Sequence, residues 1–164
     1  MTQEIILGVD PGTRICGYGL IHIQRNAYEL IDYGTIRPSP KQSLAERYYL
    51  LFQGIEEIIE TFSPSSLALE TQYVQKNVQS AMKLGMARAA ILIAAVKSSI
   101  PVFEYAPTTA KKSVCGRGLA SKQQVQEMVR HLLSLESAPK PEDAADALSL
   151  AICHAHHQQQ RSLS

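Results

Sequence analysis

The 164-residue sequence has no tryptophan, only three cysteines and no long apolar run. Cys16, Cys115 and Cys153 are odd in number and lack metal-ligand spacing, which argues against a disulfide framework and for a reducing compartment. The apolar stretch 89–96 is far shorter than the ~20 residues that span a bilayer. The first residues also lack the basic and apolar segments of a signal peptide. We therefore expect a cytoplasmic protein with no membrane partner.

The composition indicates neither disorder nor several domains. Hydrophobic residues make up 45% and charged residues 19% of the chain, which is ordinary for a globular protein. The length suits one domain that buries its own core. We expect a single domain over residues 1–157, followed by a polar, glutamine-rich, disordered tail over residues 158–164.

The formal net charge of +1 conceals an uneven distribution. Residues 1–75 carry five basic and nine acidic side chains, residues 76–140 carry ten basic and three acidic, and residues 141–164 carry one basic and three acidic. A basic middle beside acidic ends suggests a surface that binds a polyanion next to a negatively charged pocket. Lysines scattered over solvated helices would give the same count, so both explanations stay open at this point.

The hydrophobic pattern alternates between strands and helices, which predicts an α/β fold. Strand patterns cover residues 5–10, 17–23, 28–36, 67–70 and 101–105, and helical patterns cover residues 43–62, 78–98, 107–114, 121–133 and 142–157. The short turn after the first strand favours an antiparallel pair with the second strand. The fourth strand is reached through a helix and should therefore lie parallel to the first.

The first strand ends in a single acid. The apolar run 5–9 is typical of a strand buried on both faces, and Pro11 and Gly12 must end it at Asp10. A carboxylate at the edge of a core is rarely found without a metal, a base or a hydrogen-bond donor as partner. Asp before Pro-Gly can also simply cap the turn, and this stretch alone does not separate the two roles.

Three further acids occupy comparable positions. Glu70 ends a short apolar strand in the same way as Asp10, so the two side chains could lie side by side. Asp143 and Asp146 are three residues apart and share one face of the last helix. Stabilisation by the helix dipole would explain Asp143 in the first turn, whereas Asp146 lies deeper, among alanines and a leucine, as if turned toward the sheet.

Four carboxylates around one point would repel each other unless divalent cations neutralised them. An all-oxygen ligand set without cysteine suits Mg²⁺ or Mn²⁺ better than zinc. Two such ions ~4 Å apart form the clamp that cleaves phosphodiester bonds in many nucleases. The sequence therefore predicts a metal-dependent nuclease site at Asp10, Glu70, Asp143 and Asp146.

Five segments, taken in order, resemble the RuvC family of bacterial crossover junction endodeoxyribonucleases. They are ILGVDPGT (6–13), ALE (68–70), KN…SAMKLG…AR (76–88), VFEYA (102–106) and DAADAL (143–148). The resemblance covers nearly the whole chain, up to about residue 156. It implies a ribonuclease H-like α/β fold with a mixed five-stranded sheet and helices on both faces.

The resemblance also implies an activity. The family's members are homodimers that bind four-way Holliday junctions during recombination and DNA repair, and nick two opposing strands symmetrically. The products carry 5′-phosphate and 3′-hydroxyl ends that a ligase can seal. The catalytic acids match Asp10, Glu70, Asp143 and Asp146, of which the third can be His in some relatives. We expect Mg²⁺ as cofactor, two ions per site with Mn²⁺ as a substitute, and the RuvA–RuvB branch-migration complex as partner.

The resemblance further implies a set of DNA contacts. An aromatic residue just after the second acid wedges against bases at the crossover in the family, and here it is Tyr73, where Phe is frequent. Lysines that line the family's DNA channel match Lys111 and Lys122. Lys76 and Lys112 complete the predicted DNA-binding set.

Two residues stay without an assigned role. His154 is eight residues after Asp146 on the same helix, so it could approach the site, or it could be a structural histidine with satisfied hydrogen bonds. Arg117, in a basic glycine loop, departs from the family's pattern at that position.

The helix over 78–98 is a candidate dimer interface because it is rich in small residues, although burial within its own chain would explain them equally well.

Two other functions compete with the nuclease as explanations of this sequence. Actin-like ATPases and sugar kinases share a similar first turn, but they need two such domains and this chain has room for one. A non-catalytic nucleic-acid-binding module would keep the basic middle but has no reason to retain all four acids.

Overall fold

The structure, a computed structural model, describes residues 4–25, 27–71 and 76–162. The elements in chain order are β1 (Ile5–Asp10), β2 (Cys16–Gln24), β3 (Ala27–Ile36), α1 (Leu44–Phe62), β4 (Ser66–Glu70), α2 (Val78–Lys97), β5 (Val102–Tyr105), α3 (Pro107–Cys115), α4 (Lys122–Leu132) and α5 (Glu142–Ser162). The strands and helices predicted from the hydrophobic pattern are all present, with ends that differ by a few residues.

The described residues form a five-stranded sheet in the order β3-β2-β1-β4-β5. β1 lies at its centre, antiparallel to β2 and parallel to β4, so both predicted pairings are confirmed. β5 extends the parallel half and β3 the antiparallel half. In the register of β1 and β4, Val9 pairs with Leu69, so the next residues, Asp10 and Glu70, reach the same edge of the sheet together.

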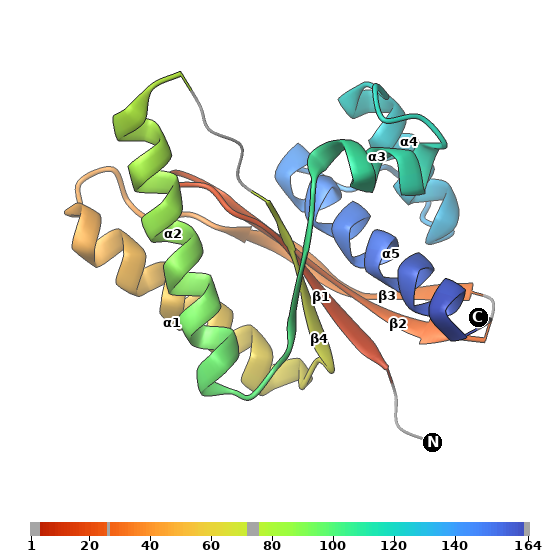
Figure 1. Cartoon of the computed structure of the whole chain (residues 1–164), viewed down its shortest axis with the longest axis horizontal. Helices are drawn as coiled ribbons and strands as arrows, with labels where there is room; N and C mark the ends of the chain where they lie inside the picture. Colours follow the sequence, from red (N-terminus) through yellow and green to blue (C-terminus); the bar gives the residue numbers. More distant parts are fainter. Residues whose placement is uncertain (1–3, 26, 72–75, 163–164) are drawn as a thin grey trace.

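Helices cover both faces of this sheet, as expected (Figure 1). On one face α1 and α2 bury a core that includes Leu7 and Val9 of β1. On the other face α3, α4 and α5 bury a second core that includes Ile6. Successive β1 side chains thus enter opposite cores, which explains why the strand reads as a continuous apolar run.

Glycines on the central strands allow α5 to lie directly against the sheet. A Cβ atom at Gly8 of β1 would collide with the carbonyl oxygen of Ala147, and a Cβ at Gly17 of β2 would collide with that of Asp143. Both obstacles are helix backbone, which cannot move aside as a flexible side chain can. The close approach brings the first turns of α5, and with them Asp146, to the end of β1.

We expect Gly8→Ala to destabilise the protein by roughly 1–3 kcal/mol, because the added methyl group must push α5 off the sheet. Denaturant unfolding measures the loss. Gly118→Ala is the matched control, since its Cβ would approach Thr108 only to 3.3 Å and should cost less than about 0.5 kcal/mol. Equal stability of the two variants would contradict the role assigned to Gly8.

The carboxyl-terminal helix is longer than the sequence suggested. The tail was expected to be disordered from residue 158, whereas α5 continues to Ser162. The Tyr28 hydroxyl lies 3.3 Å from Gln159 Oε1, and the Ser162 hydroxyl donates to the Gln158 carbonyl oxygen at 2.8 Å. The first of these contacts joins the last turns of α5 to β3, and the second lies within the helix itself. Hydrophobic periodicity gave no signal for these polar residues.

α2 has two apolar faces of different kinds. Its small residues pack inward within the chain: Ala87, Ala90, Ala94 and Ala95 are all buried. Five of its larger apolar side chains lie on the outside, between 50% and 74% exposed: Val78, Met82, Met86, Ile93 and Val96. Of the described helices, α2 alone is long and apolar enough to cross a membrane, with 28% of that stretch buried in the chain. Core helices pass the same test, so this is weak support for a membrane span.

Candidate active site

A cavity of about 260 Å³ opens where β1 and β4 end beside the first turns of α5. Its lining combines acids, lysines and a small apolar wall: Asp10, Glu70, Pro107, Ala110, Lys111, Lys122, Val125, Asp146, Ser149 and Leu150. Three acids from three separate segments thus share one hollow, and two lysines from α3 and α4 stand at its border.

Each acid is held by a different element. Asp10 is the last residue of β1 and Glu70 the last residue of β4, so the parallel pairing of these strands places them together. Asp146 comes from the second turn of α5, which the glycines of the sheet allow to approach. No acid therefore depends on a loop for its position.

The acids are crowded enough to alter their ionisation. The side chains of Asp10 and Glu70 are hydrogen-bonded to each other. Burial, together with the negative charges of Glu70 and Asp146, holds the pKa of Asp10 well above its usual range. Burial also raises the pKa of Glu70 and of Asp146. Without a counter-ion, the Asp10 carboxyl keeps its proton at a pH where a solvated carboxyl group would be ionised, because its pKa is raised.

The lysines offset part of this repulsion. Lys111 and Lys122 both oppose the rise in the pKa of Asp146, and Lys111 does the same for Glu70. Lys122 Nζ lies 3.3 Å from Glu142 Oε2, and this contact is the main reason that the pKa of Lys122 is raised. The cavity is therefore acidic inside and cationic at its border, an arrangement that suits an anionic substrate held over bound cations.

Arg88 of α2 was not identified from the sequence as part of the site. Its guanidinium donates to the backbone carbonyl oxygen of Glu70 and to the carboxylate of Glu104 on β5. Arg88 thereby links the carboxyl end of β4, at Glu70, to the carboxyl end of β5. Arg88 ends one of the five segments that resemble the RuvC family, but without the order of the strands it had no assignable partner.

The chain matches known proteins over nearly its whole length. The profile of the family described as "Crossover junction endodeoxyribonuclease RuvC" matches residues 6–154. The RuvC protein of Protochlamydia amoebophila is 59% identical over 153 residues, which cover 93% of this chain and 91% of that protein. That of Chlamydia caviae is 52% identical over 159 residues, which cover 95% and 94%. The chain belongs to the RuvC family.

The fold agrees with this assignment. The structure of Thermus thermophilus RuvC in complex with Holliday junction substrate matches with a TM-score of 0.91 at 31% identity, covering 97% of each chain. The ribonuclease H-like fold, with its mixed five-stranded sheet and helices on both faces, is therefore confirmed.

Not every residue of the RuvC pattern lies in the cavity. Asp143 is close enough for its charge to raise the pKa of Asp10 and of Asp146, but its side chain does not line the hollow. The four acids expected around one point thus divide into three in the cavity and one beside it. The difference follows from the helix, because Asp143 lies one turn nearer the amino end of α5 than Asp146.

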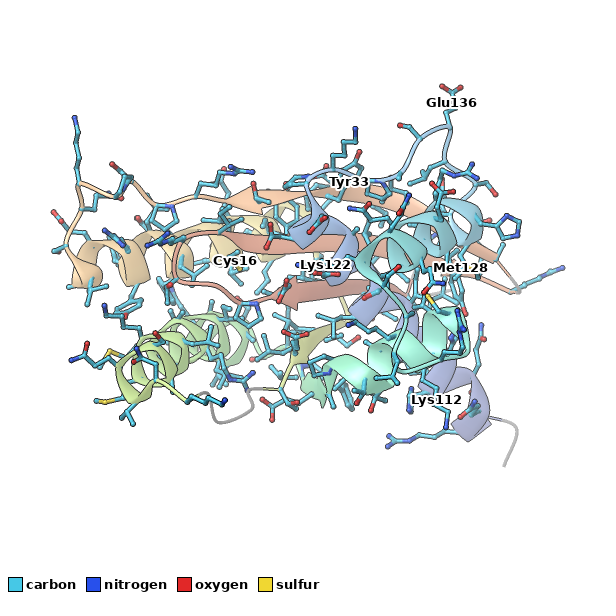
Figure 2. All side chains as sticks on the ribbon, turned by 90° about the horizontal axis from the view of Figure 1, so that it is seen from above. Cys16, Tyr33, Lys112, Lys122, Met128 and Glu136 are labelled. Carbon is cyan, nitrogen blue, oxygen red and sulfur yellow. The ribbon has the colours of Figure 1, made fainter. Side chains whose placement is uncertain are left out.

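The residues expected to contact DNA lie in several places. Lys111 and Lys122 border the acid cavity, whereas Lys112 lines a separate polar hollow with His156 and His157. Figure 2 shows Lys112 and Lys122 well apart. Lys76 is exposed just before α2. Tyr73 lies outside the described residues.

His154 does not reach the acid cavity. It is 2% exposed, its Nδ1 lies 2.7 Å from the Tyr105 hydroxyl, and its ring stacks on Phe103 with the centroids 4.3 Å apart. Burial lowers its pKa to about 4, so the ring stays neutral near pH 7. The contacts are those of a structural histidine, apart from a buried Nε2 that has no partner among the described residues.

The RuvC acids fit divalent cations by their chemistry. Their donors are carboxylate oxygens, with no cysteine or histidine in the lining, which is the ligand type that Mg²⁺ and Mn²⁺ prefer. Across the described parts of the chain, no three His, Cys, Asp or Glu side chains are grouped as they stand to hold a metal ion. Asp10 and Glu70 instead share a hydrogen bond, and that contact must open for both to serve as ligands.

Proposed function

We propose that this protein is a metal-dependent endonuclease that resolves four-way DNA junctions in recombination and repair. It nicks two opposing strands symmetrically and leaves 5′-phosphate and 3′-hydroxyl ends that a ligase can seal. The observation that carries the proposal is the meeting of Asp10, Glu70 and Asp146 in one cavity bordered by lysines, in a chain of the RuvC family. The T. thermophilus RuvC structure, a complex with Holliday junction substrate, supports the same substrate.

Asp10, Glu70 and Asp146 would hold the divalent cations, with Asp143 close enough to add its charge or to complete the ligand set. We propose Mg²⁺, two ions per site, with Mn²⁺ as a substitute. Bound there, the cations would stabilise charge on the phosphate and lower the pKa of an attacking water. Because ligands must be deprotonated and the pKa of Asp10 is raised, cation binding at this site is linked to loss of the Asp10 proton.

The remaining residues of the site bind and orient the strand. Lys111 and Lys122 stand at the border of the cavity, where their ammonium groups would contact backbone phosphates on the approach to the acids. Such contacts give affinity and position without reading sequence. Selectivity for junctions must then come from the branched shape. The hydrogen bond from Arg88 to the Glu70 carbonyl oxygen holds the backbone at the end of β4 and so positions the Glu70 side chain for DNA binding.

We also propose that Tyr73 stacks against bases at the crossover, by its place three residues after Glu70 in the RuvC pattern. Lys76, which is exposed shortly after it, and Lys112, on the outer side of α3, would hold the neighbouring backbone. RuvA and RuvB are proposed partners, and the cytoplasm is the proposed location, in keeping with three free cysteines in the described residues.

A homodimer is the proposed assembly. The exposed side chains of Val78, Met82, Met86, Ile93 and Val96 recur at helical spacing and form one apolar stripe along the outside of α2. Contiguous exposed apolar surface of this kind marks protein interfaces. A second copy related by two-fold symmetry would cover the stripe with its own and would offer one active site to each of two opposing strands.

The test of this function is cleavage of a synthetic four-way junction with and without Mg²⁺, with a linear duplex of the same sequence as control. We expect paired nicks in the junction only, only with the metal present, and products that DNA ligase seals. Equal cleavage of the duplex, or cleavage that persists after chelation of divalent cations, would contradict the proposal.

A further inference from the structure

A second concave surface lies on the other side of the turn that follows Asp10. A hollow of about 520 Å³ is lined by Pro11, Gly12, Thr13, Arg14, Leu44, Arg47, Ser80, Lys83 and Leu84. A neighbouring hollow of about 710 Å³ is lined by Arg14, Ile15, Arg37, Pro38, Ser39, Pro40 and Arg47. Arg14 and Arg47 line both hollows, and we call the two neighbouring hollows together the arginine cleft.

The arginine cleft is cationic. Arg14, Arg37, Arg47 and Lys83 line it, and among the described residues none of the four has a carboxylate oxygen within 4.0 Å. The nearby acid Glu46 is engaged elsewhere, because its carboxylate accepts a hydrogen bond from the backbone N–H of Ser43 in the capping box of α1. Four cations gathered without acids lack a balancing anion.

Two of the arginines are held in place before any ligand arrives. Arg47 donates from Nε to the Gln42 carbonyl oxygen at 3.1 Å and from Nη2 to the Pro40 carbonyl oxygen at 2.8 Å. A guanidinium has five N–H donors, so others remain for an anion. Arg37 donates from Nε to the Thr35 hydroxyl at 3.1 Å. These contacts to uncharged oxygens orient the guanidinium groups without neutralising them, which lowers the entropic cost of binding an anion.

The lining of the cleft starts one residue after an acid of the active site. Pro11, the first residue of its lining, directly follows Asp10, which lines the acid cavity. Lys111 and Lys122 border that cavity from α3 and α4, whereas the cleft lies among the β1–β2 turn, the start of α1 and the first half of α2. Cationic surfaces therefore flank the acids on both sides, and two hollows in succession offer room for more than one phosphate.

We propose that the arginine cleft binds the sugar–phosphate backbone of the junction arm that leaves the active site on the α1–α2 side. This inference rests on the proposed junction-binding function and adds a binding surface to it. Guanidinium groups pair with phosphate oxygens through two parallel hydrogen bonds, and the hydroxyls of Thr13 and Ser80 in the same lining add further donors. An acidic protein is the competing ligand class, and the position of the cleft lining directly after Asp10 in the chain favours DNA.

The test uses the full-length double variant Arg14→Gln/Lys83→Gln, whose two side chains are both exposed, so folding should be unaffected. Junction binding is measured from 50 to 200 mM salt in Ca²⁺. We expect about tenfold weaker binding at the lower salt, with a slope of log Kd against log salt shallower by about 1 for each lost phosphate contact. Arg37→Gln, in the neighbouring hollow, is a second variant and should lower the slope by about half as much.

The matched control is Arg25→Gln. Arg25 is also exposed, but it lies in the β2–β3 connection, at the opposite end of β2 from the cleft, and should bind as the wild type does. Wild-type affinity and slope in both cleft variants would overturn the inference while leaving the proposed nuclease function intact. Failure of the wild-type protein to bind the junction at all would overturn both.

Discussion

Asp146→Asn is expected to lower junction cleavage by about a thousandfold or more while leaving junction binding within about twofold of the wild type. The asparagine keeps the size of the side chain but removes one of the three carboxyl groups in the cavity. The lysines at the border are untouched, so the DNA is still held. The measurement is single-turnover cleavage of a labelled four-way junction in Mg²⁺, with binding followed separately in Ca²⁺.

The matched control for this experiment is Glu136→Gln. Glu136 is an exposed acid after α4 that points away from the site, as Figure 2 shows, and its loss should leave cleavage unchanged. Asp10→Asn should behave like Asp146→Asn, because both side chains line the same cavity. Cleavage by either Asn variant at the wild-type rate would remove that residue from the catalytic set.

Ile93→Asp is expected to convert the protein from dimer to monomer, with dimer affinity at least a hundredfold weaker. Ile93 is 59% exposed in the apolar stripe on α2, one turn before its last member, Val96. Two-fold symmetry would bury the new carboxylate twice, without a partner, and each such burial costs several kcal/mol. Analytical ultracentrifugation gives the mass, and a cruciform plasmid shows whether paired nicks become single, unlinked nicks.

Leu119→Asp is the control for the dimer experiment. Leu119 is 95% exposed in the α3–α4 connection, so the change also places a charge on exposed apolar surface, but away from α2. It should leave the mass unchanged. A wild-type monomer, or a dimer that survives Ile93→Asp, would contradict an interface along this stripe.

The positions that the sequence predicted well are those set by local pattern and chain direction. Asp10 and Glu70 each end an apolar run, and a helix between the two strands makes those strands parallel. Together these two facts are enough to bring the acids to one edge of the sheet. The helix that carries Asp146 was recognised by periodicity. Its distance from the sheet depends on Gly8 and Gly17, whose importance appears only once α5 is seen against them.

What the sequence could not predict depends on contacts between distant segments. The charge of residues 1–75 sums to a negative value, yet folding brings Arg14, Arg37 and Arg47 from that segment into one cleft. In the same way, helical spacing put Asp143 on the face of Asp146, but only the packing of α5 decides which of them lines the cavity.

The central claim is that acids from three segments form one cation site. Anomalous diffraction from crystals grown with Mn²⁺ tests it most directly. We expect anomalous density within coordination distance of carboxylate oxygens of Asp10, Glu70 and Asp146, and its loss in Asp146→Asn crystals. Mn²⁺ bound only elsewhere, or a cavity that stays free of the metal at saturating Mn²⁺, would contradict the account.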